Sequence, residues 1–290
     1  MRIHRSRGAL AARFPGIVRC LGAIGAIAIT GVTALATTTG PATASTTQDI
    51  DFAATVALSN CSGSLVAMPD SQPQDPALVL TNGHCLELGM PSPGEVIMDV
   101  PSSRSFALLD SDANTVATLY AESIAYSTMT DTDITLYRLD TDYRTISDNH
   151  GIEPLMMSAS RPQQGTAITV VSAFWEQTYS CGIAGFAPEL HEAGWVWQDS
   201  VRYTPQCHTI GGTSGSPVVD DNGTVVAVNN TLNENGQQCT MNNPCEVDED
   251  GTVTVHEGVG YAQQTYLVPA CVDAGNVIDL DLPGCRLPRP

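Results

Sequence analysis

Ser214 lies in a glycine-rich stretch, residues 211–217, with the sequence Gly-Gly-Thr-Ser-Gly-Ser-Pro. Glycine readily adopts positive φ angles, so successive backbone N–H groups in such a stretch can converge on one point. The amides of Gly212 and Ser214 are candidate donors of an oxyanion hole, which would stabilise the negative oxygen formed when Ser214 attacks a carbonyl. A Gly-x-Ser-Gly cluster alone is more often an ordinary turn, so this chemistry needs partners elsewhere in the chain.

Two further segments supply those partners. His84 stands in Thr-Asn-Gly-His-Cys, directly after the apolar run 77–80, which predicts a buried strand ending in a turn. Asp133 begins an alternating segment, residues 133–139, typical of a strand with one buried face. Asp131 is a competing candidate that composition does not separate from it. A serine, a histidine and an aspartate offer the nucleophile, base and orienting group of acyl transfer.

The elements that carry these residues are predicted to be strands. Glycine and proline punctuate the chain at short intervals, and the runs between them are rich in Val, Ile and Thr, as in residues 166–171. This pattern is typical of an all-β protein. The chain is also long enough for two barrel-like halves with a sizeable apolar core.

Five segments together resemble, in order, the secreted trypsin-like serine proteases of the chymotrypsin fold, along about the last 240 residues. They are Cys61-Ser-Gly-Ser-Leu-Val, Thr81-Asn-Gly-His-Cys, Asp133-Ile-Thr-Leu, Gly212-Thr-Ser-Gly-Ser-Pro and Val225-Val-Ala-Val. The order His, Asp, Ser is that family's, whereas unrelated folds carry the triad in other orders. The match selects Asp133 over Asp131.

The resemblance implies two packed antiparallel six-stranded β-barrels with the active site in the cleft between them. Residues 45–150 would form the N-terminal barrel, with His84 and Asp133, and residues 151–290 the C-terminal barrel, with Ser214. It also implies a serine endopeptidase that works through an acyl-enzyme, with His84 as base and Asp133 as its orienting group. No cofactor or catalytic metal is expected.

One departure from the family pattern concerns activation. Animal members place an aspartate directly before the serine, where it pairs with the amino terminus released by zymogen cleavage, and this chain has Thr213 there. We therefore expect no activation of that kind. The form Gly-x-Ser-Gly-Ser-Pro resembles the bacterial branch that includes the glutamyl endopeptidases.

The resemblance also assigns substrate-binding positions, namely His208 at the base of the specificity pocket, Thr209 beside it, and Val228 and Asn229 on the strand that lines it. No aspartate stands at the base, so trypsin-like cleavage is not expected. Thr209 matches a threonine that contacts the substrate acid in bacterial glutamyl endopeptidases, which favours glutamate or aspartate. Val228 weakens that hypothesis, because those enzymes place a histidine there.

The N-terminus has the composition of a signal peptide. Residues 1–19 contain five arginines, residues 20–47 carry no charge, and an apolar run ends shortly before Ala42-Thr-Ala44. We interpret residues 1–44 as a signal peptide cleaved after Ala44, which predicts a secreted, extracellular protein. An uncleaved membrane anchor is the alternative.

The chain contains no lysine, and without the leader 7 arginines face 31 acidic residues, a net charge near −24. Such a surface repels polyanions, which argues against nucleic acid and anionic membranes as partners. We expect a monomer that acts on polypeptide substrates and has no membrane contact after signal cleavage.

Eight of the nine cysteines follow the leader, and an even number in an exported protein indicates disulfides. They are Cys61, Cys85, Cys181, Cys207, Cys239, Cys245, Cys271 and Cys285. The resemblance implies the pair 61–85, and sequence proximity suggests 181–207, 239–245 and 271–285. A 207–239 pair is a competitor. A zinc site is disfavoured because no Cys-x-x-Cys occurs.

Two acidic stretches, residues 110–114 and 248–251, suggest calcium, but neither completes an EF-hand loop. For the second, a hairpin turn is the more economical interpretation.

The sequence disfavours two other functions. A protease-like binding module without catalysis is disfavoured because all three triad positions are filled. A lipase or esterase would need Gly-x-Ser-x-Gly and the order Ser, Asp, His.

Overall fold

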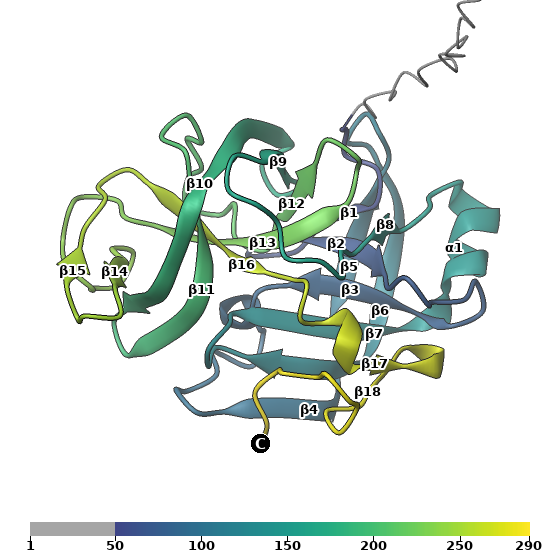
Figure 1. The fold of residues 1–290 in the computed structure, drawn as a ribbon. Helices are drawn as coiled ribbons and strands as arrows, with labels where there is room; N and C mark the ends of the chain where they lie inside the picture. The colour runs from purple at the N-terminus through teal and green to yellow at the C-terminus, as the bar shows by residue number, and fades with distance from the viewer. Residues whose placement is uncertain (1–49) are drawn as a thin grey trace, which may run out of the picture. The chain divides into compact units, whose positions relative to one another are not determined.

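The structure, a computed structural model, describes residues 50–290, which form two large β-sheets, each closed into a ring (Figure 1). The predicted signal peptide, residues 1–44, and the alternative of a membrane anchor lie outside the described residues. In the described part, no helix is both long enough and apolar enough to cross a bilayer.

The first sheet has eight strands, and six of them close a ring in the order β1-β5-β6-β7-β3-β2, with β1 pairing to β2. The strands are β1 (Thr55–Ala57), β2 (Ser62–Ala67), β3 (Pro76–Thr81), β4 (Val96–Pro101), β5 (Ser105–Leu109), β6 (Thr115–Thr128), β7 (Ile134–Asp142) and β8 (Leu155–Met156). All pairs within the ring are antiparallel. Outside it, β4 pairs with β6, and β8 runs parallel to β2.

The second sheet repeats this plan, with a ring in the order β11-β16-β13-β12-β9-β10 that closes through β10 and β11. Its strands are β9 (Ala167–Ser172), β10 (Gln177–Glu192), β11 (Trp195–Tyr203), β12 (Pro217–Asp220), β13 (Val225–Leu232), β14 (Cys245–Val247), β15 (Val253–Thr254) and β16 (Gly260–Gln264). The predicted all-β fold with two six-stranded barrels is therefore confirmed.

Short helices and a small hairpin complete the chain. They are η1 (Gly83–Cys85), α1 (Tyr143–His150), η2 (Pro269–Cys271), η3 (Ala274–Asn276), and the paired strands β17 (Val272–Asp273) and β18 (Val277–Ile278). Helix α1 begins after Asp142, whose carboxylate accepts a hydrogen bond from the Thr145 amide at 2.7 Å. This is ordinary N-capping, which satisfies a backbone donor left free at the helix start.

The C-terminal segment packs on the first barrel. Val268, Ile278 and Leu280 share a buried cluster with Leu78 and Leu80 of β3. The predicted domain limits, 45–150 and 151–290, remain a prediction.

Strand β3 is buried on both faces. Ala77 and Val79 face the core inside the first barrel, while Leu78 and Leu80 face the cluster shared with the C-terminal segment. A strand covered on both sides reads as a continuous apolar run rather than an alternating one. Strand β3, which leads to His84, is therefore held rigidly by packing on both of its faces.

The structure joins the cysteines in the four predicted pairs, 61–85, 181–207, 239–245 and 271–285. The 207–239 alternative is excluded because Cys207 bonds to Cys181. Cys61, His84 and Cys85 form a group of three possible metal ligands. Its two sulfurs are bonded to each other and are not free thiolates.

Both acidic stretches form turns. The Asp248 carboxylate accepts hydrogen bonds from the amides of Asp250 and Thr252, between β14 and β15, as the hairpin interpretation predicted. The Asp110 carboxylate accepts from the amides of Asp112 and Asn114, and these bonds lower its pKa. Each first aspartate thus bonds to its own turn.

Candidate active site

His84 and Asp133 are joined by two hydrogen bonds. The Nδ1 atom of His84 lies 2.7 Å from Oδ2 of Asp133, and the His84 amide donates to Oδ1 at 3.0 Å. Asp133 is completely buried, and its main-chain carbonyl accepts a bond of 2.8 Å from the side chain of Asn82. With Nδ1 held by the carboxylate, the other ring nitrogen, Nε2, is left for the cleft.

The pKa of His84 is raised above its ordinary value. Burial lowers this pKa, but the negative charge of Asp133 and the hydrogen bond to it outweigh the burial, and the charge of Glu192 adds a further increase. These groups stabilise the imidazolium form. A histidine in this setting is suited to accept a proton during catalysis.

The turn that carries His84 is fixed from several sides. The guanidinium of Arg104, only 6% exposed, donates to the Cys85 carbonyl at 2.6 Å and to the Tyr137 hydroxyl at 3.0 Å. The Cys61–Cys85 disulfide ties the same turn to β2. Gly83 is required, because a Cβ there would lie 2.2 Å from the Thr128 carbonyl oxygen.

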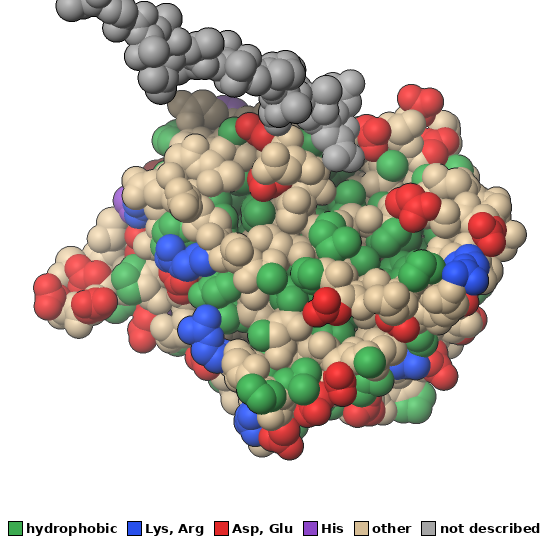
Figure 2. Space-filling model, turned by 45° about the vertical axis from the view of Figure 1, so that its right-hand side comes forward, with side chains coloured by type: hydrophobic (Ala, Val, Ile, Leu, Met, Phe, Trp, Pro, Cys, Tyr) green, Lys and Arg blue, Asp and Glu red, His purple; other side chains and the backbone are tan. Residues whose placement is uncertain are grey.

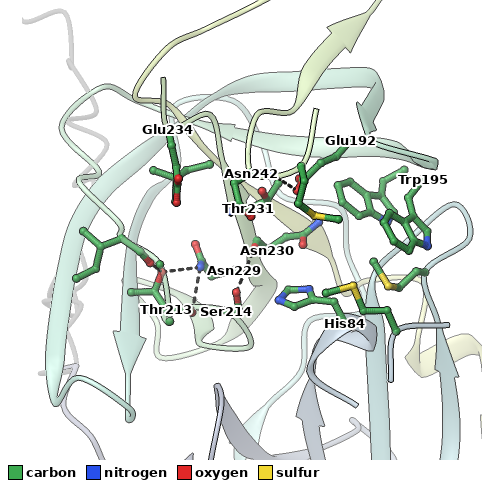
Figure 3. A pocket seen from close by; sticks show the side chains of 18 residues that line it. His84, Glu192, Trp195, Thr213, Ser214, Asn229, Asn230, Thr231, Glu234 and Asn242 are labelled. Atoms are coloured by element: carbon green, nitrogen blue, oxygen red, sulfur yellow. Dashed lines mark hydrogen bonds between the residues drawn. The ribbon is translucent and has the colours of Figure 1, made fainter. Parts of the chain in front are cut away.

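Ser214 faces the same cleft as His84 (Figure 3). Its hydroxyl donates to the Asn230 carbonyl at 3.2 Å. Within residues 50–290, no hydrogen bond joins this hydroxyl to His84. Such bonds are often long or poorly aligned without substrate, and rotation about χ1 of Ser214 would redirect the hydroxyl.

The backbone around Ser214 has the form of an oxyanion hole. Gly212 has a φ of 89°, and neither its amide nor that of Ser214 donates to a protein acceptor within the described part of the chain. The amide between them, of Thr213, donates to the Ile210 carbonyl at 3.1 Å. Two backbone donors are thus left for a substrate oxygen.

A neutral network holds Thr213 in place. Its hydroxyl donates to the Ile210 carbonyl at 2.6 Å, and the Asn229 side chain donates to its carbonyl and hydroxyl oxygens at 3.0 and 3.1 Å. Asn229 in turn accepts a bond of 3.1 Å from the Tyr203 hydroxyl. Hydrogen bonds to neutral groups therefore hold the loop at Thr213. The absence of zymogen-type activation stays a prediction.

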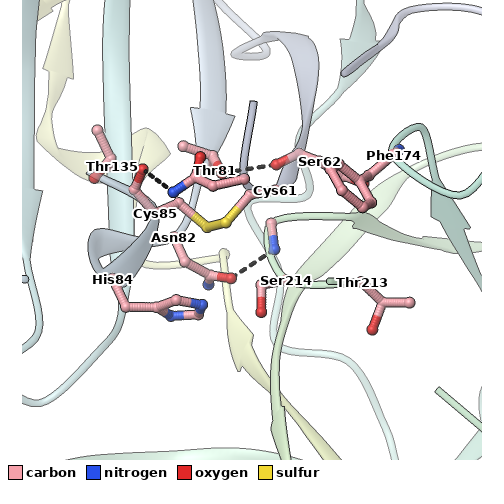
Figure 4. The surroundings of a disulfide bond; sticks show 12 residues. Cys61, Ser62, Thr81, Asn82, His84, Cys85, Thr135, Phe174, Thr213 and Ser214 are labelled. Atoms are coloured by element: carbon pink, nitrogen blue, oxygen red, sulfur yellow. Dashed lines mark hydrogen bonds between the residues drawn. A yellow bond between two sulfur atoms is a disulfide. The ribbon is translucent and has the colours of Figure 1, made fainter. Parts of the chain in front are cut away.

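The two barrels contact each other directly beside Ser214 (Figure 4). The Ser62 amide donates to the Ser214 carbonyl at 2.8 Å, and the Gly215 amide donates to Oδ1 of Asn82 at 2.6 Å. Gly215 has a φ of 77°, and a Cβ there would lie 2.1 Å from the Ser62 carbonyl oxygen. Asn82 therefore bridges the loop of Ser214 and the main chain of Asp133.

The cleft is lined by both apolar and polar side chains. Its apolar residues are Met90, Met129, Trp195, Trp197, Ile210, Leu232 and Met241, and its other side chains include His84, Glu192, Thr213, Ser214, Asn229, Asn230, Thr231, Glu234 and Asn242. The lining comes from both barrels. It contains no arginine and, since the chain has none, no lysine.

Of the four predicted substrate-binding residues, only Asn229 lines this cleft. His208 is exposed, Thr209 is buried next to Gly260, and Val228 is buried in the cluster with Leu78. The substrate-binding roles of these residues stay a prediction.

A β-bulge on β13 changes which of its side chains face the cleft. The register of this strand shifts between Asn229 and Thr231. A bulge interrupts the alternation of side chains, so neighbouring residues can face the same side. Asn229 and Asn230 accordingly both line the cleft.

Asp131, the competitor of Asp133, has a structural role. Its side chain is exposed, and its main chain pairs with β11 through the Val196 carbonyl and the Gln198 amide.

Sequence reasoning missed Asn82, Glu192 and Asn230. The signal for Asn82 was its place in the Thr81-Asn-Gly-His-Cys segment, two residues before His84. Glu192 ends a long strand and Asn230 lies within an apolar one, and no local pattern marks either.

Solved structures of several proteases are similar to this chain. Among solved structures, the MamO protease domain from Magnetospirillum magneticum is 12% identical with a TM-score of 0.45, covering 73% of this chain and 92% of that one. An inactive form of the protease Rv3671c is 14% identical with a TM-score of 0.44, covering 74% and 85%. A Glu endopeptidase in complex with MPD is 14% identical with a TM-score of 0.42, covering 73% and 85%.

With TM-scores below 0.5, these three structures carry no argument about the family of this chain. No curated protein matches the chain. The model of the trypsin-like peptidase domain matches residues 61–228, more than half of the sequence. That match includes all three triad candidates and strands of both barrels, and on this ground the chain belongs to the trypsin-like peptidases, a family of serine proteases.

Proposed function

We propose that this serine protease is a secreted endopeptidase that cleaves peptide bonds through His84, Asp133 and Ser214 and an acyl-enzyme intermediate. The observation that carries the proposal is the hydrogen bond between His84 and the buried Asp133, with His84 lining the same cleft as Ser214. The unpaired amides of Gly212 and Ser214 in that cleft support it further.

In the proposed reaction, His84 Nε2 takes the proton of the Ser214 hydroxyl as the oxygen attacks the substrate carbonyl. The amides of Gly212 and Ser214 donate to the resulting oxyanion, and Asp133 stabilises the imidazolium. His84 then protonates the leaving amine, which leaves an ester on Ser214. A water molecule, activated by His84, hydrolyses the ester and restores the enzyme.

Secretion is proposed from the predicted signal peptide and supported by the four disulfides, which persist in oxidising compartments. Acidic side chains are spread over the face shown in Figure 2, with basic ones at separate spots. This surface suits a monomer that does not bind nucleic acid or anionic membranes.

We do not propose that the enzyme prefers substrates with glutamate or aspartate. Two carboxylates, of Glu192 and Glu234, line the cleft, and neither arginine nor lysine is there to pair with an acidic substrate. Like charges in a shared cleft disfavour binding.

The test is labelling of the mature protein with a fluorophosphonate probe, followed by mass mapping of the labelled peptide. We expect one label, on Ser214, and none in a Ser214→Ala variant. Folded protein that stays unlabelled would contradict the proposal and favour a protease-like binding module.

A further inference from the structure

The wall that the second barrel contributes to the cleft contains buried polar atoms without partners. Glu192 is 5% exposed, and its Oε1 accepts a bond of 2.8 Å from the Asn242 amide, while its Oε2 is buried without any hydrogen bond. Asn230 is 3% exposed, and both polar atoms of its side chain are buried and unpaired. Both residues line the cleft that holds Ser214 (Figure 3).

Unpaired polar atoms of this kind are unfavourable in an interior. Each one destabilises the folded protein when it is left without a hydrogen bond, and more so when the group is charged. Within residues 50–290, Glu192 forms no ion pair that would offset its burial. Polar atoms that line an open cleft can instead be satisfied by a ligand.

The chemistry of the lining limits what that ligand can be. The free oxygen of Glu192 accepts hydrogen bonds, and its carboxylate form carries negative charge. Asn230 adds an amide oxygen that accepts and an amide N–H group that donates, and the indole N–H of Trp197 is a further buried donor without a partner. Met129 and Trp197 are almost fully buried beside them, and Trp195 is half-buried. An aliphatic stem that ends in several N–H donors with positive charge matches both the apolar walls and the acceptors.

We propose that Glu192 and Asn230 form a substrate subsite that binds the side chain of a lysine or arginine in the polypeptide. The inference rests on the proposed function, since it names the substrate class of the same cleft. His208 does not line this cleft, so the subsite is separate from the pocket position that the sequence assigned to His208.

The pKa of Glu192 also supports a bound cation at this subsite. Burial raises the pKa of Glu192, whereas the nearby Thr231 hydroxyl, the hydrogen bond from the Asn242 amide and the charge of His84 lower it. A cation bound at Oε2 would stabilise the carboxylate form and offset the burial.

The test measures kcat/KM of the mature enzyme for fluorogenic peptides in which each position before the scissile bond carries, in turn, lysine, arginine, norleucine, glutamine or glutamate. We expect lysine or arginine to exceed norleucine by about tenfold or more at one position, the scale of a single satisfied charge contact. In a Glu192→Gln variant this ratio should fall to about twofold or less. The glutamine is isosteric and retains an acceptor for the Asn242 amide.

Glu234→Gln is the matched control, because Glu234 also lines the cleft but is exposed. It should change the ratio less than Glu192→Gln does. A wild-type enzyme that prefers norleucine, glutamine or glutamate at every position would overturn the proposal. A basic preference that Glu192→Gln leaves intact would also overturn it.

A measurement on the wild type guards against a variant that does not fold. Butylguanidinium should slow fluorophosphonate labelling of Ser214 more than butylurea, its neutral analogue. Equal slowing would contradict the subsite. Labelling of Ser214 without basic preference would refute the subsite alone, whereas failure to label Ser214 would refute the proposed function.

Discussion

On the first-barrel side of the cleft, both oxygens of the Asp133 carboxylate are hydrogen-bonded, whereas on the second-barrel side Glu192 has one oxygen bonded and one without a partner. Both carboxylates are buried. The His84 pair is complete before substrate arrives, as preorganised catalysis requires. The Glu192 wall is incomplete, as expected of a surface whose partner is the substrate.

The difference extends to the residues behind each carboxylate. The His84 turn is held by a disulfide, by Arg104 and by Asn82, which all bond within the protein. Asn230, beside Glu192, contributes its carbonyl to Ser214 but leaves its side chain unpaired. Substitutions on the first-barrel side should therefore affect the rate or the stability, and those on the second-barrel side the choice of substrate.

The largest expected effect comes from breaking the His84 pair. Asp133→Asn should lower kcat by about 10⁴-fold, equivalent to about 5.5 kcal/mol, because an amide favours the wrong imidazole tautomer and does not stabilise the imidazolium. Asp131→Asn is the matched control, since that side chain is exposed, and it should retain near-normal kcat. Comparable losses in the two variants would show that Asp133 is not the orienting residue.

Arg104 tests the support behind that pair. Arg104→Met should lower the free energy of unfolding by about 2–4 kcal/mol, because it removes charged hydrogen bonds to the Cys85 carbonyl and the Tyr137 hydroxyl and leaves those groups buried. Urea denaturation measures the change. Arg144→Met, at an exposed position, should stay within about 0.5 kcal/mol. An equally small change for Arg104 would count against its role as a clamp.

Asn82 tests the connection between the two walls. Asn82→Ala removes the acceptor of the Gly215 amide and the donor to the Asp133 carbonyl, which should cost about 1–3 kcal/mol, or about 5–150-fold in kcat if the cost falls on the active geometry. Asn222→Ala, in an exposed turn, is the control. A lower melting temperature with unchanged kcat would reduce Asn82 to a structural residue.

Short contiguous patterns explain why the residues of the proposed triad could be selected from the sequence. His84 and Ser214 each stand among glycines that the backbone requires, as the close approaches at Gly83 and Gly215 show. The apolar run before His84 was also informative, because β3 is covered on both faces. In these segments the local sequence reflects the local structure.

The lining of the cleft could not be predicted in the same way. Glu192 and Asn230 meet only through the closure of the second barrel, and the bulge in β13 changes which side chains face the cleft. Counting back from Ser214 selected His208, which the fold leaves exposed. Such positions depend on register and on long-range packing, which a single sequence does not encode in any local pattern.

The smallest expected effect is a shift in the pH dependence of the rate, caused by the charge of Glu192 on one wall acting on His84 on the other. Catalysis needs neutral His84, so the rate should rise with pH through the raised pKa of His84, placing the acidic limb above the ordinary value of 6.5. After the opposing effect of burial, Asp133 contributes most of this increase and Glu192 the least of the named groups. Glu192→Gln removes that charge and should move the acidic limb to lower pH.

An uncharged fluorophosphonate is the appropriate reagent for this measurement, because its labelling rate then reports His84 without a contribution from substrate charge. Glu234→Gln, at the exposed position on the same cleft, should move the limb less, since solvent screens its charge. A limb that stays at the same pH in Glu192→Gln would mean that Glu192 does not act on His84 through its charge. The two walls would then be electrostatically independent, and Glu192 would act on the substrate alone.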